Sequence, residues 1–262
     1  MNKSTGELCA VKRQEANGVK DGQQKLLREL DMSKGLQHKN VVVLLGHVLQ
    51  GDHIYTLMEL VAGGSMKQLL EEFGPLSEKT LKMSTEGLLS GLDYLHTSKP
   101  PVIHRDIKCA NLLVELDMTV KLADFGCAKR DMLCESYTTI GSIPWMAPEV
   151  IKSESAYGRS ADIWSVGCTI IEMATAAAPW GKAAFDNVWT AMYLISMSEE
   201  APPISDSIPE QARDLIRMCL QRSPESRPQA YELLEHEFLA GDSRDSACSS
   251  SRDMISFSSN NY

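Results

Sequence analysis

Residues 102–114 read V-I-H-R-D-I-K-C-A-N-L-L-V, and residues 121–126 read K-L-A-D-F-G. This stretch is the most informative part of the sequence. It contains two carboxylates, a lysine and an amide at fixed offsets: Asp106, Lys108, Asn111 and Asp124. These residue types fit phosphoryl transfer, which needs a base to orient an attacking hydroxyl and oxygen ligands for Mg²⁺. Each residue alone has an ordinary structural alternative, such as a salt-bridged loop Asp or a capping Asn.

Further segments on either side narrow the interpretation. A-V-K precedes the central stretch at residues 10–12, and A-P-E follows it at residues 147–149. A-x-K, H-R-D-x-x-x-x-N, D-F-G and A-P-E in this order are the signature of protein kinases. The chain therefore resembles the eukaryotic protein kinase catalytic domain over residues 5–239. T-G-E-L-C-A-V-K, W-M-A-P-E-V-I and Y-G-R-S-A-D-I-W-S-V-G-C-T-I-I-E-M-A-T resemble the MAP kinase kinase kinase group within it.

The resemblance implies a role for each residue of the central stretch. Asp106 would be the catalytic base, and Lys108 would contact the transferred phosphate. Asn111 and Asp124 would bind Mg²⁺, an ion that prefers oxygen ligands. Lys12 would pair with the α- and β-phosphates of ATP, with Glu29 as its helix partner. A lysine two residues after the catalytic Asp is the Ser/Thr form of this loop, so the expected products are phosphoserine and phosphothreonine.

The resemblance also implies an adenine site. Met58 matches the gatekeeper, and backbone groups of Glu59 and Val61 match the hinge that hydrogen-bonds the adenine edge. The other residues implied for this site are two that would sandwich the ring and one that would reach the ribose: Ala10, Leu113 and Ser65. An apolar slot of this kind is strand core and adenine site at once.

The activation segment would run from Asp124 to Glu149. It contains the hydroxyls of Ser136, Thr138 and Thr139, and Thr138 matches the usual phosphorylation site best. Arg105 beside the catalytic Asp would pair with a phosphate added there. The alternative is that these are plain solvent-exposed hydroxyls.

Four more residues resemble fixed structural points of the family. Ser142 stands where a hydroxyl pairs with the catalytic Asp and Lys. Glu149 and Arg227 resemble a buried ion pair that fixes the end of the activation segment, and Asp162 resembles the carboxylate that holds the catalytic loop backbone.

The chain departs from the family in two places. Ser33 replaces an apolar residue, which would weaken a column through Leu44, His104 and Phe125. No G-x-G-x-x-G loop precedes Lys12. We therefore expect a fragment of a longer kinase or a catalytically impaired one, and weak binding of ATP by the chain itself. The competing interpretation is a pseudokinase-like binding module.

Composition limits the remaining classes of protein. The 262 residues are 43% hydrophobic, and 26 basic against 35 acidic residues give a net charge of −9. This charge disfavours a nucleic-acid adaptor. No stretch approaches the about 18 apolar residues of a membrane helix. The seven scattered cysteines show no zinc spacing and indicate reduced thiols. We expect a cytoplasmic protein that contacts a protein substrate, such as a MAP kinase kinase, and is activated by an upstream kinase or by autophosphorylation.

Hydrophobic patterns place the predicted strands mainly before residue 63 and the helices after it, and the resemblance implies an α+β, two-lobed fold. Strands are predicted at 7–13, 41–49 and 54–60, and an amphipathic helix around Leu26 to Leu36. Longer helices are predicted at 81–96, 162–175, 184–197, 209–220 and 228–236, the first of this set ending near His96. The expected domains are a truncated sheet lobe (1–61), a helical lobe (62–239) and a flexible Ser-rich tail (240–262).

Overall fold

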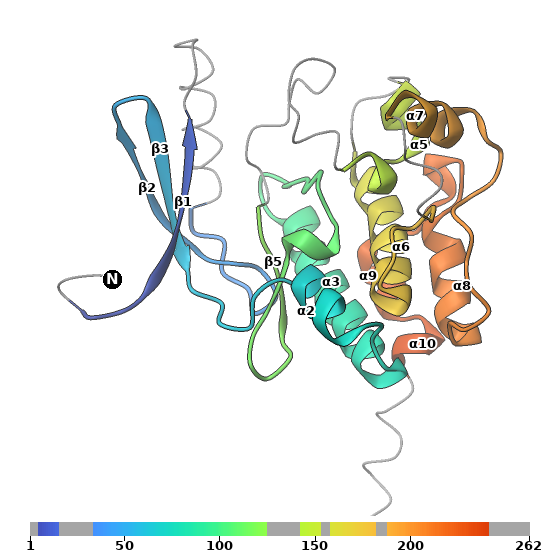
Figure 1. Cartoon of the computed structure of the whole chain (residues 1–262), viewed down its shortest axis with the longest axis horizontal. Coiled ribbons are helices and arrows are strands. Elements are labelled where there is room, and N and C mark those ends of the chain that lie inside the picture. Colours follow the sequence, from blue (N-terminus) through green and yellow to red (C-terminus); the bar gives the residue numbers. More distant parts are fainter. Residues whose placement is uncertain (1–4, 16–33, 125–141, 153–157, 182–187, 241–262) are drawn as a thin grey trace, which may run out of the picture.

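The computed structural model describes residues 5–15, 34–124, 142–152, 158–181 and 188–240. It confirms the α+β class: a small antiparallel sheet lies on one side and a group of helices on the other (Figure 1). No helix among these residues has the length and apolar character needed to cross a membrane. The domain boundaries given above remain predictions, and residues 241–262 of the Ser-rich tail lie outside the described ranges.

The sheet in the described part has the order β1-β3-β2. Its strands are β1 (Cys9–Glu15), β2 (Leu44–Gln50) and β3 (His53–Glu59), and the short turn at Gly51 joins the last two. The antiparallel register places Lys12 opposite Thr56 and Ala10 opposite Met58. Strand β1 forms one edge of this sheet, so it has one backbone edge without a strand partner among the described residues.

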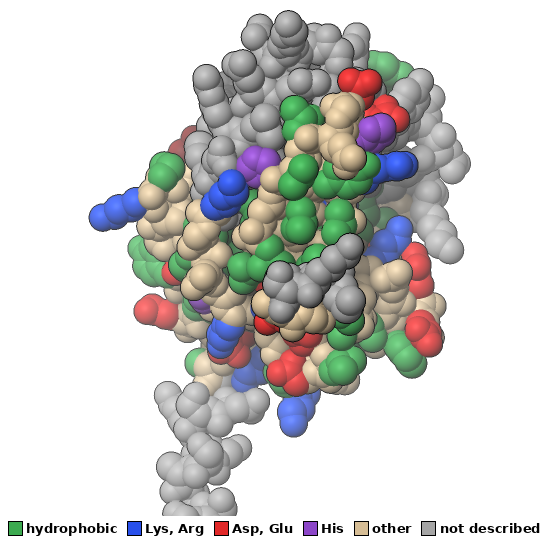
Figure 2. All heavy atoms as spheres, turned by 90° about the vertical axis from the view of Figure 1, so that its left-hand side faces the viewer, with side chains coloured by type: hydrophobic (Ala, Val, Ile, Leu, Met, Phe, Trp, Pro, Cys, Tyr) green, Lys and Arg blue, Asp and Glu red, His purple; other side chains and the backbone are tan. Residues whose placement is uncertain are grey.

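Hydrophobic side chains gather on the sheet side of the molecule, which faces the viewer in Figure 2. Val11, Leu45 and Val48 belong to this sheet and are 54%, 57% and 53% exposed. Exposed apolar residues that are contiguous over a surface usually mark an interaction site. The structure thus leaves part of this sheet uncovered by the residues it describes.

The prediction that the second strand starts at Val41 is wrong, because residues 41–43 join the two parts of the molecule. The amide of Val42 donates to the carbonyl of Leu122 at 2.9 Å, and the amide of Leu122 donates to the carbonyl of Asn40 at 2.9 Å. Helix α3 (Glu78–Thr97) approaches this segment so closely that a Cβ at Gly91 would lie 2.5 Å from the Asn40 carbonyl oxygen. The sheet is therefore tied to the helical part at its base.

Each of the five longer predicted helices has a counterpart in the structure, with shifted ends. The long central helix is α6 (Arg159–Thr175), and its residues 161–173 are buried on every side, which confirms a buried central helix. Trp164 on α6 is fully buried in the main core. The remaining helices of this part are α5 (Pro148–Lys152), α7 (Val188–Met197), α8 (Glu210–Cys219), α9 (Ala230–Leu234) and α10 (Glu237–Ala240).

One further helix was not predicted, nor were the short α5 and α10, and one predicted helix lies mostly outside the described ranges. Helix α2 (Met66–Phe73) was not among the predicted elements, although Ser65 and Gln68 form a capping box at its start. The predicted helix around Leu26 lies mostly outside the described residues. Its last member, Leu36, is not helical and packs instead against the main core.

Candidate active site

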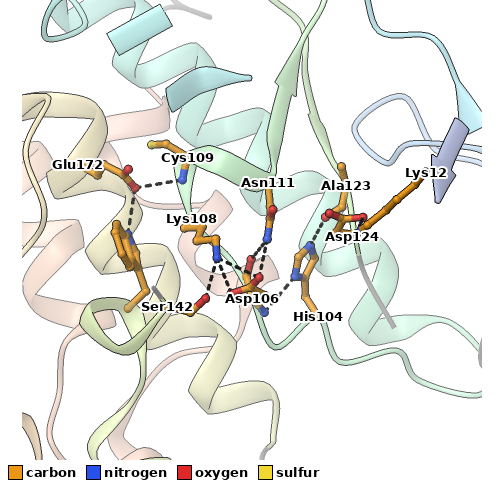
Figure 3. Close-up of polar contacts among 11 residues, drawn as sticks. Lys12, His104, Asp106, Lys108, Cys109, Asn111, Ala123, Asp124, Ser142 and Glu172 are labelled. Carbon is orange, nitrogen blue, oxygen red and sulfur yellow. Dashed lines mark hydrogen bonds and ion pairs between the residues drawn. The ribbon is translucent and has the colours of Figure 1, made fainter. Parts of the chain in front are cut away.

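The loop between α3 and the hairpin of β4 (Leu112–Val114) and β5 (Val120–Leu122) brings together the central polar residues (Figure 3). Lys108 Nζ lies 3.1 Å from the Asp106 carboxylate and 2.6 Å from Ser142 Oγ. Asn111 Nδ2 donates to Asp106 Oδ2 at 2.8 Å and to the Asp106 carbonyl at 2.7 Å. The Asp106 carboxylate is thus oriented by a cation on one side and an amide on the other.

Asp162 fixes the backbone of this loop through hydrogen bonds. Its carboxylate is fully buried and accepts the amides of His104 and Arg105, each at 2.8 Å. His96, which sequence reasoning had used only as a helix end, contacts the same carboxylate at 2.9 Å. Arg105 has φ of 72°, a left-handed conformation that costs about 1–3 kcal/mol in a non-glycine residue. The hydrogen bonds from these two backbone amides to Asp162 offset the strain at Arg105, the residue before Asp106.

His104 connects the loop with the segment that follows β5. Its Nε2 donates to the Ala123 carbonyl at 3.0 Å, and its Nδ1 accepts the Asp106 amide at 3.3 Å. One nitrogen donates and the other accepts, so this geometry needs the neutral imidazole. Burial lowers the pKa of His104 in agreement with that tautomer, outweighing the nearby carboxylates that raise it.

Asp124 directly follows Ala123, and its side chain points back to the sheet (Figure 3). Lys12 Nζ on β1 lies 2.8 Å from Asp124 Oδ1, so the contact joins residues that are 112 positions apart in the sequence. Asp124 also has positive φ, 62°. Glu29, the predicted partner of Lys12, lies outside the described residues, as do Ser33 and Phe125.

Three of the residues predicted to surround adenine pack together. Val61, Met58 and Leu113 pack with Val42 and Ala123 in one small apolar cluster. Ala10 reaches this place through its register with Met58. Ser65 caps α2 through its side chain, and its backbone forms a β-bridge with Leu113. The side chain therefore has a structural role in addition to the ribose contact predicted for it.

Glu59 has a contact that sequence reasoning missed. Its carboxylate accepts the Val43 amide at 2.8 Å and pairs with Lys121 Nζ at 2.9 Å. Val43 directly precedes β2 and Lys121 lies on β5, so this side chain links the predicted hinge to both parts. Lys121 is 62 residues away from Glu59 in the sequence, so no local sequence pattern could predict this pair.

Ser142 is the one predicted activation-segment hydroxyl that the structure describes, because Ser136, Thr138 and Thr139 lie within 125–141. The segment ends in a buried ion pair: Arg227 donates from Nη1 and Nη2 to the Glu149 carboxylate at 2.7 and 2.8 Å. The same guanidinium lies over the Trp164 ring, 5.1 Å from its centroid. The structure therefore brings Glu149 and Arg227 together as the sequence predicts.

Asn111 and Asp124 are the residues predicted to bind Mg²⁺. The described residues contain no cluster of three or more His, Cys, Asp or Glu side chains that could hold a metal. Asn111 uses its amide nitrogen for both bonds to Asp106, which makes its oxygen the atom able to ligate a cation. One carboxylate, one amide oxygen and substrate phosphates are a usual Mg²⁺ environment. Asn111 and Asp124 thus fit this ion.

Comparison with known proteins identifies the class. The protein kinase domain family matches residues 1–239. The chain belongs to this family, which binds ATP.

The relatives at about 40% identity are MAP kinase kinase kinases. The chain is 42% identical to mitogen-activated protein kinase kinase kinase ANP1 of Arabidopsis thaliana over 94% of its own length. It is 40% identical to mitogen-activated protein kinase kinase kinase YODA of Arabidopsis thaliana over 91% of its length. It is also 40% identical to mitogen-activated protein kinase kinase kinase 19 of Homo sapiens over 90%. The matches cover 38%, 27% and 18% of those proteins, so the chain spans well under half of each.

Proposed function

We propose that the chain transfers the γ-phosphate of ATP to serine or threonine side chains of a protein substrate. The observation that carries this proposal is the arrangement of Asp106, whose carboxylate contacts Lys108 and Asn111 while Lys108 reaches Ser142. Membership of the kinase family and similarity to MAP kinase kinase kinases support it. Neither supports the pseudokinase interpretation.

The polar contacts support a part in the reaction for each of these residues. Asp106 would accept a hydrogen bond from the substrate hydroxyl and align it with the phosphate. Lys108 would balance negative charge on the phosphoryl oxygens, and Lys12 would hold the phosphates that remain with ADP. Mg²⁺, held by Asn111 and Asp124, would neutralise charge on the phosphates. In such a site, positioning and electrostatics supply most of the rate enhancement.

The names of the relatives point to a substrate class. A MAP kinase kinase kinase is named for its action on a MAP kinase kinase, and we infer a substrate of that kind for this chain. We further propose that an upstream kinase or autophosphorylation in residues 125–141 activates it. The described cysteines, Cys9, Cys109, Cys168 and Cys219, are free thiols, which supports a reducing, cytoplasmic location.

A transfer assay with phosphoamino acid analysis tests the proposal. The chain would be incubated with radiolabelled ATP, Mg²⁺ and a purified MAP kinase kinase, both as it stands and preceded by a two-stranded G-x-G-x-x-G segment. This second form is the extended chain below. We expect label on serine or threonine with the extended chain and far less with the chain alone. No transfer by either form, or label on tyrosine alone, would contradict the proposal.

A further inference from the structure

A buried glutamate lies behind the catalytic loop, away from Asp106. Glu172 stands in the last turn of α6 and is only 8% exposed, and Figure 3 shows its carboxylate directed at Cys109. We propose that Glu172 is a positioning residue: it holds the catalytic loop and the segment after Ser142 in fixed relation for phosphoryl transfer. The proposal rests on the function proposed above and adds a residue that the motifs do not include.

One oxygen atom of Glu172 receives a donor from each of the two segments. Oε2 accepts the Cys109 amide at 3.0 Å and the indole Nε1–H of Trp145 at 2.9 Å. Burial raises the pKa of Glu172, whereas the bonds from Cys109 and Trp145 lower it. Burial of a carboxyl group destabilises the folded protein, and the hydrogen bonds from Cys109 and Trp145 only partly offset this desolvation.

Each anchored residue lies close in the chain to a side chain at the front of the site, Lys108 or Ser142. Cys109 follows Lys108 and opens the 3₁₀ turn Cys109–Asn111, in which the Asn111 amide donates to the Lys108 carbonyl at 2.9 Å. Trp145 ends the 3₁₀ turn Ile143–Trp145, and its amide donates to the Ser142 carbonyl at 3.1 Å. A shift at either anchor is therefore passed directly to Lys108 or to Ser142.

The same two segments also meet at the front of the site. Lys108 Nζ and Ser142 Oγ lie 2.6 Å apart there, while Glu172 joins Cys109 and Trp145 behind them. The Lys108–Ser142 contact and the Glu172 hydrogen bonds connect the two turns at two separate points, which fixes their relative orientation. With one connection alone, the turns could rotate relative to each other. Glu172 thus determines how Lys108 approaches Asp106 and Ser142 without touching any of them.

Other contacts would keep the fold intact when the carboxylate is removed. Ser165 Oγ donates to the Trp145 carbonyl at 2.8 Å, which attaches that residue to α6 independently of Glu172. Asp162 likewise continues to hold the backbone of His104 and Arg105. Loss of Glu172 should therefore change the geometry of the site more than the stability of the fold.

The test compares Glu172→Ala, Glu172→Gln and Trp145→Phe with a matched control, Thr175→Val. Gln keeps a carbonyl oxygen that can accept both donors, whereas Ala keeps none, and Phe removes only the indole donor. Thr175 lies one turn further along α6. Its hydroxyl donates to the Ile171 carbonyl at 2.7 Å and accepts the Ala177 amide at 3.3 Å, and neither contact reaches the catalytic loop or the segment after Ser142. Hydrogen exchange of the Cys109 amide is measured on the 262-residue chain, and kcat and KM on the extended chain.

We expect Glu172→Ala to lower kcat about 100-fold, the scale of a misplacement of about 1 Å, with KM for ATP within about twofold. Exchange of the Cys109 amide should rise about tenfold as its hydrogen bond is lost. Trp145→Phe should lower kcat while leaving Cys109 exchange slow. Glu172→Gln should restore kcat to within about threefold, since geometry rather than charge is required. Thr175→Val should match the parent.

Several outcomes would overturn the proposal. One is an unchanged kcat in Glu172→Ala despite faster exchange of the Cys109 amide, and another is a loss of kcat in Glu172→Gln as large as in Glu172→Ala. If Glu172→Ala does not fold, a parental kcat in Trp145→Phe would have the same meaning. An extended parent chain that transfers no phosphate would instead contradict the proposed function, and the exchange data would still show whether Glu172 holds the loop.

Discussion

Lys12 on β1 and Asp124 after β5 form an ion pair of 2.8 Å that spans the space between the sheet and the helical part. Both side chains are about one-third exposed, at 35% and 32%. An ion pair with that much solvent access contributes little to folding, at most about 1 kcal/mol. Asp124 is also a predicted Mg²⁺ ligand, and the function proposed above assigns Lys12 to the phosphates of ATP rather than to the stability of the fold.

We expect Lys12→Met to separate activity from stability. The extended chain should lose at least about 100-fold in kcat/KM for ATP, because a charge aimed at the phosphates is removed. Its free energy of unfolding should change by no more than about 1 kcal/mol. Steady-state kinetics and urea denaturation measure the two quantities. A large loss of stability with normal kcat/KM would assign Lys12 to the fold instead.

His104 should resist protonation in the folded protein. Burial holds its folded pKa below the usual value of 6.5, so the unfolded chain binds more protons just below that pH. The contribution of His104 to stability is therefore present above pH 6.5 and is lost as the pH falls from there through the folded pKa. NMR titration of the ring should give a midpoint below 6.5, and His104→Gln should reduce the loss of stability between pH 7 and pH 5. A midpoint above 6.5 would contradict the neutral tautomer.

The ion pair of Glu149 and Arg227 should be costly to break on one side. Arg227 is fully buried at its side chain, so Glu149→Ala leaves a buried cation without its carboxylate. We expect a loss of about 3–5 kcal/mol in the free energy of unfolding. The double variant Glu149→Met with Arg227→Met should lose less than Glu149→Ala, because no buried charge remains. Urea denaturation of the three proteins decides the matter, and equal stability of Glu149→Ala and the parent would contradict a buried ion pair.

Phosphorylation at Thr138, or failing that at Thr139, should raise the rate of transfer. A phosphate adds a charge of about −1.5 to −2, with which Arg105, the residue before Asp106, is expected to pair. Phosphosite mapping of active protein and the activity of Thr138→Ala with Thr139→Ala test this. An unmodified segment in fully active protein, together with full activity of the double variant, would refute it.

Local spacing predicted the catalytic-loop residues, whereas remote pairs were predicted only where the resemblance implied them, as for Glu149 and Arg227. Asp106, Lys108 and Asn111 lie within one loop, so their motif alone brings them together. The second strand was misjudged because the apolar run from Val41 reads as strand, whereas Val42 bonds to Leu122 in the helical part. Glu172 escaped notice because its donor Cys109 is 63 residues away, and a lone glutamate in an apolar helix gives no signal of what it accepts.

The most direct test of the central claim is transfer of labelled phosphate by Asp106→Asn in the extended chain. Asparagine keeps the size and the contact with Lys108 but removes the carboxylate that aligns the acceptor hydroxyl. We predict a kcat about 100- to 10,000-fold below the parent, with parental circular dichroism and parental binding of MgATP. A rate near that of the parent would show that Asp106 is not the base of this site, and the proposed assignment of the reaction would be wrong.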